Sequence, residues 1–310
     1  MIVVLLCALT LNFIIPRAMP GGAIDVYTSG EKLPQAAAQA LIQRFGLDKP
    51  VLTQFALYLK NTFTGEFGLS FFYYPKPVSA LIKKALPWSL FLIITAEVLT
   101  VPIGYFLGVV AGWKPGSKRD STIQAASLAI LATPLFWIAM IFLFIFSFIL
   151  GWFPLAGAQT VGAEYANWLE HLGDIIWHAV LPILSLATAF GAYELIMRNT
   201  MITTLREHYV LTAEAKGLSE NAVKYRHAAR NALLPVVTSA ILGFAMAVSG
   251  SVYVETIFSY PGIGRLMYNS IMQRDYPVLQ GGFLVYSVVM VAAVFLLDVI
   301  YMRLDPRIRF

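Results

Sequence analysis

The chain has 310 residues, of which 58% are hydrophobic and only 13% charged. A soluble globular domain carries about 25% charged residues, so this composition argues against a soluble protein. The net charge of +5 fits the orientation of membrane helices better than nucleic-acid binding, because the basic residues are not interleaved with aromatic ones. Cys7 is the only cysteine, which excludes an intrachain disulfide and a cysteine-based metal cluster.

Six apolar stretches are long enough, or nearly long enough, to cross a bilayer, for which a helix needs about 20 residues. They predict an all-α polytopic membrane protein with six transmembrane helices, over residues 2–15, 88–113, part of 121–153, 175–197, 232–254 and 281–302.

The first stretch, within residues 1–19, has a signal peptide as its alternative. It lacks a basic start, and "IIPRAMPGG" offers no clear cleavage site, so a transmembrane helix is preferred. Residues 20–86 are expected to form an extracytoplasmic helical cap. Two short helices are predicted there, over 33–45 and 48–63, the second with Pro50 in its first turn and Asp48 near its cap.

The distribution of Lys and Arg predicts the orientation. More than half of these residues lie in the connections between stretches two and three and between stretches four and five, or in the C-terminal tail, whereas residues 151–177 contain none. Both connections and both termini are therefore expected in the cytoplasm, including the loop over residues 198–234.

No catalytic, metal or cofactor motif is found. The sequence lacks GxxxxGK[ST], and its four histidines show no metal-ligand spacing. Acidic residues within predicted spans are Glu97, Glu194 and Asp298. They are candidate proton carriers of a proton-coupled secondary transporter; alternatively, Glu97 bonds a neighbouring helix while the other two reach the membrane interface.

Small residues recur at helical spacing in the fifth stretch, at Ala240, Gly243, Ala247 and Gly250. Such a face lets another helix approach closely. It fits packing within the chain, a seam with a second subunit, or a side that faces a pore.

The polar stretch before the fifth span has helix signals. Gly217 ends one helix, Ser219 is a suitable N-cap for the next, and Glu220 suits the positive end of that helix. A short helix is expected over 220–229, with Pro235 in the first turn of the next span. An ordered cytoplasmic helix of this kind is typical of a docking element. On the outer side, a short re-entrant or interfacial helix is predicted over 264–272, with a packed hairpin as the alternative.

Several motifs resemble one family. "AKGLS" and "RHAARNALLPVVT" resemble the cytoplasmic EAA loop of ABC importer permeases, in the form used by the dipeptide/oligopeptide permeases. "ETIFSYPGIGRL", "RDYPVLQGG", "LDPRIR", "FGLDKP", "GEFGLS" and "GWFP" extend the resemblance over nearly the whole chain. One departure is that the Glu-Ala-Ala of the general motif falls on Leu211-Thr212-Ala213.

The resemblance implies the type I ABC importer permease fold, with residues 87–310 as a permease core of five transmembrane helices. It implies a second homologous permease subunit, two ATPase subunits that bind ATP and Mg, an extracytoplasmic solute-binding protein and a prokaryotic cytoplasmic membrane. No cofactor, catalytic activity or nucleic-acid partner is expected for this chain. Di-/oligopeptides are the expected substrates, although similar permeases move nickel complexes, glutathione or oligosaccharides. A membrane-embedded enzyme remains a third hypothesis, without a catalytic constellation.

The resemblance also implies site residues. In the coupling loop, Val223 and Tyr225 are expected to enter an ATPase groove, and Arg226 and Arg230 to pair with acidic residues there. The full ATPase-coupling set is Ala213, Glu214, Gly217, Leu218, Ser219, Val223, Tyr225, Arg226, His227, Arg230, Asn231 and Pro235. A translocation path or outer gate is expected at Tyr253, Glu255, Tyr260, Pro261, Gly262 and Arg265.

Overall fold

The computed structural model describes residues 2–18 and 48–304, and this part of the chain is helical. Its one strand-like feature is an isolated antiparallel bridge between Leu69 and Pro77. The helix predicted over 33–45 lies outside the described residues. The chain divides into two compact units, Met1–Leu90 with Pro261–Ala292, and Phe91–Tyr260 with Ala293–Phe310.

The first unit contains α1 (Ile2–Ala18), α4 (Val51–Thr64), the start of α5 (Val78–Trp113), α13 (Ile263–Met272) and the first part of α14 (Tyr276–Leu304). Helix α4 confirms the second of the two short helices predicted after the first span. Its N-cap is Pro50, which therefore lies one residue before the first turn in which it was expected, and Asp48 lies two residues before the N-cap. Helix α13 confirms that residues 264–272 are helical.

Helix α5 begins ten residues before the predicted apolar stretch and continues through Pro87. Its first turns bury Val78, Ile82 and Ala85 in a core shared with α13 and α14, which supply Ile263 and Leu279 among others. This packing extends the helix beyond its membrane-crossing part, because burial of an apolar face stabilises a helix more than its local propensity does.

The segment before α5 is held by one buried carboxylate. Asp275, between α13 and α14, accepts hydrogen bonds from the Ser70 hydroxyl and from the backbone N–H groups of Phe71 (3.0 Å) and Phe72 (3.2 Å). Asp275 is fully buried, so these donors replace the water that its charge would otherwise require.

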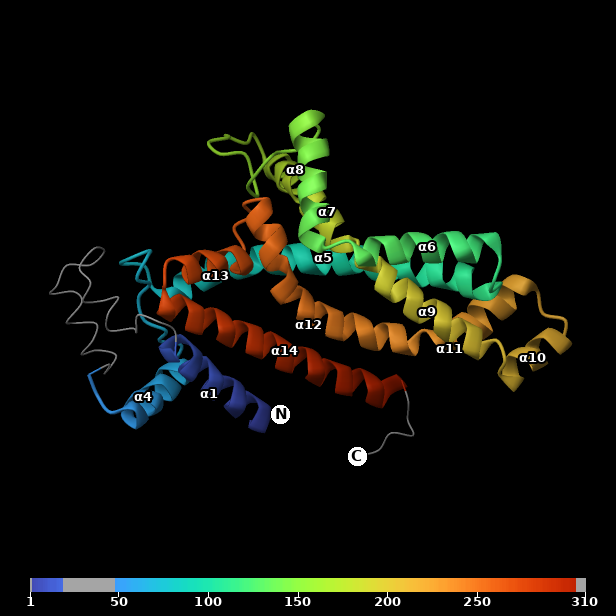
Figure 1. Ribbon diagram of the computed structural model, residues 1–310, viewed down its shortest axis with the longest axis horizontal. Helices are drawn as coiled ribbons and strands as arrows, with labels where there is room; N and C mark the ends of the chain where they lie inside the picture. Colours follow the sequence, from blue (N-terminus) through green and yellow to red (C-terminus); the bar gives the residue numbers. More distant parts are fainter. Residues whose placement is uncertain (1, 19–47, 305–310) are drawn as a thin grey trace. The chain divides into compact units, whose positions relative to one another are not determined.

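The second unit contains the remaining helices in chain order (Figure 1). They are the rest of α5, α6 (Lys118–Ala132), α7 (Leu135–Phe142), the π-helical η1 (Leu143–Ile149), α8 (Trp168–Ala187), α9 (Phe190–Thr204), α10 (His208–Ala215), the π-helical η2 (Ala222–Ala229), α11 (Arg230–Ala232), α12 (Leu234–Ile257) and the rest of α14.

Two predicted spans are broken. Helix α6 and the α7–η1 helix are bent by 95°, and the break falls at Thr133 and Pro134. Helices α8 and α9 are bent by 42° across Thr188 and Ala189. The span predicted within residues 121–153 is therefore divided between two helices, because Pro134 supplies no N–H for the preceding turn and starts a new helix instead.

By length and composition, two helices in the described residues could each cross a membrane, over Val78–Trp113 and Tyr276–Leu297. Counting each bent pair as one span gives four. Shorter apolar stretches lie in α1, over Leu5–Ile15, and in α12, over Leu234–Phe244.

Helices α5 and α9 pack closely through a row of glycines. A Cβ atom at Gly104, Gly108 or Gly112 of α5 would lie 2.5, 2.5 and 2.7 Å from the Cβ atoms of Tyr193, Met197 and Met201, respectively. Only glycine permits this approach. The contact joins α9, which leads into the predicted coupling loop, firmly to α5.

Candidate coupling surface

The loop over residues 198–234 begins on a helix that is fixed by an ion pair. On α9, Arg198 binds Asp120 at the start of α6 through Nε–Oδ1 (2.5 Å) and Nη2–Oδ2 (2.8 Å). Asp120 also accepts the N–H of Gly116 (2.8 Å), and its own N–H is capped by Ser117. A bidentate ion pair of this kind fixes the orientation of α6 and α9 relative to each other.

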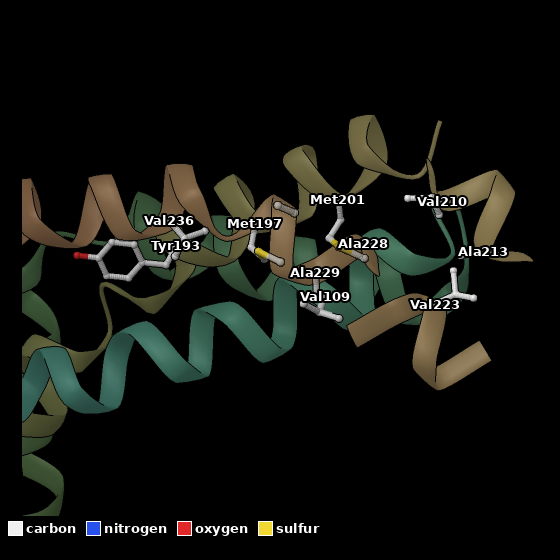
Figure 2. Packing of buried hydrophobic residues seen from close by; sticks show 11 residues of the cluster. Val109, Tyr193, Met197, Met201, Val210, Ala213, Val223, Ala228, Ala229 and Val236 are labelled. Atoms are coloured by element: carbon white, nitrogen blue, oxygen red, sulfur yellow. The ribbon is translucent and has the colours of Figure 1, made fainter. Parts of the chain in front are cut away.

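Beneath the loop lies a continuous apolar core (Figure 2). Its buried residues come from α5, from α9, from the loop itself and from α12. They are Val109, Tyr193, Met197, Met201, Val210, Ala213, Val223, Ala228, Ala229, Ala232 and Val236. The loop is therefore an ordered part of the fold, attached to both α9 and α12.

The turn at Gly217 matches the prediction. Gly217 has φ +75°, its N–H binds the carbonyl of Glu214 (2.9 Å), and the N–H of Leu218 binds the carbonyl of Ala213 (3.4 Å). A Cβ atom at Gly217 would meet nothing within 4 Å. The requirement for glycine thus comes from the left-handed backbone conformation and not from crowding.

The second helix starts at Ser219, whose Oγ accepts the N–H of Ala222 (3.4 Å). A contact that the sequence did not predict fixes this start. The Glu220 carboxylate accepts the indole N–H of Trp113 (2.6 Å) and pairs with Lys114 (3.2 Å) at the end of α5. These two groups hold the pKa of the Glu220 carboxyl below its ordinary value. Because 107 residues separate the partners, no local signal could have revealed the contact.

Several exposed side chains of the loop are apolar or basic. Leu218 and Tyr225 are exposed, as is Leu211, which sequence reasoning did not select. Arg226 and Arg230 are also exposed and form no ion pair with an acidic residue in the described part of the chain. We call these five residues the coupling surface.

Val223 requires a correction. It was expected to enter an ATPase groove, but it is 1% exposed and packs in the core of its own chain. Ala213, a member of the predicted ATPase-coupling set, is also buried there. Both residues support the loop from within, since a side chain buried in this way presents nothing to a partner.

Four other predicted coupling residues, Glu214, Ser219, Asn231 and Pro235, are exposed, and His227 is half-buried. The side chain of Asn231 donates a hydrogen bond to the His227 carbonyl (3.1 Å). Pro235 lies in the first turn of α12, as predicted.

The predicted path or gate residues fall into two groups. In the second unit, Tyr253 is exposed, whereas Glu255 and Tyr260 are fully buried. In the first unit, Pro261, Gly262 and Arg265 line a pocket beside the start of α13.

The structure places two of the three acidic residues of the predicted spans. Glu97 accepts a hydrogen bond from the Tyr193 hydroxyl of α9 (3.1 Å), which confirms the bond to a neighbouring helix. Glu194 is fully buried, so the expectation that it reaches the interface is wrong. The side chain of Asp298 lies outside the described residues.

Gly243 packs within the chain, because a Cβ atom there would clash with the Tyr193 hydroxyl and lie 3.6 Å from the Glu97 carboxylate. The surroundings of Ala247 and Gly250 lie outside the part of the structure that is described. No group of three or more His, Cys, Asp or Glu residues that could hold a metal occurs in the described ranges.

Comparison with known proteins gives consistent results. Residues 104–310 match the family of the "Binding-protein-dependent transport system inner membrane component". An oligopeptide transport system permease protein of Bacillus subtilis (strain 168) is 37% identical over 99% of this chain and 96% of its own length. A dipeptide transport system permease protein of Alkalihalophilus pseudofirmus is 33% identical over 100% of this chain and 97% of its own.

Among solved structures, the crystal structure of an amino acid ABC transporter with histidines aligns with a TM-score of 0.52. It is 17% identical and covers 73% of this chain and 94% of its own, so it speaks for the fold alone. The family match spans two thirds of the chain, and relatives match it along its whole length. The chain belongs to the family of binding-protein-dependent transport system inner membrane components.

Proposed function

We propose that this chain is the permease subunit of an ATP-driven importer of di- or oligopeptides, in which the coupling surface docks on a partner ATPase. The observation that carries the proposal is the exposure of Leu218 and Tyr225 on a loop that is packed on a buried core, which includes Met201 of α9 and Val236 of α12. A push on this loop would move both helices. The peptide class rests on the relatives, which are named as oligopeptide and dipeptide permeases.

In the proposed mechanism, ATP closes two partner ATPase subunits, and their motion passes through the coupling surface to α9 and α12. The translocation path then opens outward to receive the solute from an extracytoplasmic binding protein, and ATP hydrolysis returns it to the inward-facing state. This chain contributes the path and the coupling contact, and its partners hold ATP and Mg.

The proposed topology has six crossings with both termini in the cytoplasm. Four come from α5, α14 and the two bent pairs. Helices α1 and α12 supply the others; they have 17 and 24 residues, respectively, close to the length that spans the hydrocarbon core. The orientation rests on the Lys and Arg distribution.

The test is purification of the tagged chain from its native membrane, followed by reconstitution in vesicles. We expect ATPase subunits and a second permease to co-purify, and we expect peptide uptake that requires ATP and binding protein. Uptake driven by a proton gradient without any ATPase would favour the secondary transporter. ATP-dependent uptake of a nickel complex, glutathione or an oligosaccharide in place of peptide would overturn only the substrate class.

A further inference from the structure

A basic pocket in the first unit is not explained by the coupling mechanism. It has a volume of about 340 Å³ and lies between the segment before α5, the first turns of α5 and α13. Lys76, Lys84 and Arg265 contribute to its lining, and none of the described residues that line it is acidic. The pocket therefore favours an anion.

Two of these cations are available to a ligand. Lys76 and Lys84 are exposed, and neither forms an ion pair with a carboxylate in the described ranges. Helix α13 begins beside them, after Gly262, and the positive end of its dipole adds to the field in the pocket.

The pocket also has an apolar part, beside the polar side chains of Tyr73 and Asn269. Leu81 and Ala85, on α5, and Leu266, on α13, form this part of the wall. A small hydrated anion gains nothing from such a surface, because apolar surface is stabilised by contact with other apolar groups. The combination of ammonium groups and aliphatic side chains matches an amphiphile with a charged head.

The position along α5 agrees with a lipid. Lys84 precedes Trp88, the first residue of the apolar stretch, by four residues, which is about 6 Å of helix rise. In the proposed topology this end of α5 lies at the outer surface of the bilayer, at the level where headgroup phosphates surround the hydrocarbon core. Exposed ammonium groups at this depth can reach the phosphate of an anionic headgroup, because Lys and Arg close to the bilayer surface attract anionic lipids.

We propose that this pocket binds the headgroup phosphate of an anionic phospholipid of the outer leaflet, with Lys76 and Lys84 on the phosphate and Leu81, Ala85 and Leu266 on the glycerol and upper acyl chain. The inference rests on the proposed topology. The bound lipid would connect α13 to the start of α5 and stabilise the outer end of the permease.

The experiment uses the purified transporter complex and phosphatidylglycerol, with retained lipid counted by native mass spectrometry. The test variant is Lys76→Gln with Lys84→Gln. The control is Lys60→Gln with Lys83→Gln, which removes the same charge from exposed lysines that do not line the pocket.

We expect the test variant to retain one phosphatidylglycerol molecule fewer and to rebind it about 30-fold more weakly, since each lysine contributes about fivefold to affinity for an anionic lipid. The control should match the unmodified complex. Equal retention in both variants would overturn the proposal. So would unchanged lipid retention with weakened affinity for the binding protein, which would assign the pocket to a protein carboxylate. Co-purification of the ATPase in every variant keeps this outcome separate from failure of the proposed function.

Discussion

Single residues in the coupling loop divide into those that support it and those that face outward. Val223 and Tyr225 are two positions apart, yet Val223 is fully enclosed while Tyr225 is 38% exposed. The sequence alone placed both in a partner's groove. The structure separates their roles, so substitutions at the two positions should fail in different ways.

We expect Val223→Asp to lower the stability of the chain by several kcal/mol, because it buries an unpaired carboxylate. Tyr225→Asp should leave the thermal unfolding of the purified chain unchanged but reduce ATPase co-purification and transport. Arg226→Ala should have a milder effect, since an exposed charge contributes about 0–1 kcal/mol. Thermal unfolding in detergent and the ATPase-to-permease ratio are the two measurements. A Val223→Asp variant that unfolds at the same temperature as the unmodified chain but no longer binds the ATPase would contradict this assignment. It would show that Val223 contacts the ATPase directly.

The turn at Gly217 gives a second prediction at this scale. Gly217→Val should strain the left-handed turn by about 1–3 kcal/mol, whereas Gly217→Asn should be tolerated, because Asn adopts this conformation more readily. No neighbour lies within 4 Å of the added Cβ in either variant, so the two differ mainly in backbone preference. Stimulation of ATP hydrolysis by the binding protein should fall in the Val variant and persist in the Asn variant. Equal stimulation in both would show that the turn is not part of the coupling.

At the scale of secondary-structure elements, the contact between α5 and α9 leaves no room for added side-chain volume. Gly108 lies where a Cβ would approach the Met197 Cβ at 2.5 Å and the Glu194 carbonyl oxygen at 2.7 Å. Gly108→Ala should therefore destabilise the chain by about 1–3 kcal/mol through overpacking.

The matched control is Gly173→Ala, in α8, where a Cβ meets nothing within 4 Å. This change should be neutral or stabilising by up to about 1 kcal/mol, because alanine favours a helix over glycine. Thermal unfolding of both purified variants is the measurement, and a Gly108→Ala variant as stable as Gly173→Ala would argue against the close packing of α5 on α9.

Most helices could be predicted from local signals, and the places where prediction failed have physical causes. The Gly217 turn and the helix after it follow from capping and backbone preferences within a few residues, and α13 follows from a composition too polar to cross lipid and too apolar for a bare loop. The bend at Pro134 could not be predicted with certainty, because proline can either start a helix or kink one. The partner of Glu220 and the inward direction of Val223 depend on helices distant in sequence.

At the scale of the whole molecule, the proposed topology can be tested by labelling from each side of the membrane. In a Cys7→Ala background, Ser219→Cys should react with an impermeant thiol reagent only after the cytoplasmic side is opened. Ala163→Cys, in the connection after η1, should react from outside. Both positions are exposed, so access is decided by the membrane and not by burial. Labelling of Ser219→Cys from outside would invert the orientation.

The most direct test of the proposed coupling surface is site-specific photo-crosslinking in the intact transporter. A photoreactive residue at Tyr225 or Leu218 should crosslink to an ATPase subunit, with a yield that changes when ATP is added. The same residue at Val161, which is 98% exposed in the connection after η1, should not crosslink to the ATPase. ATPase adducts at Tyr225 and Leu218, and none at Val161, are the predicted result. Adducts at Tyr225 to lipid or to the solute-binding protein, with none to the ATPase, would contradict it.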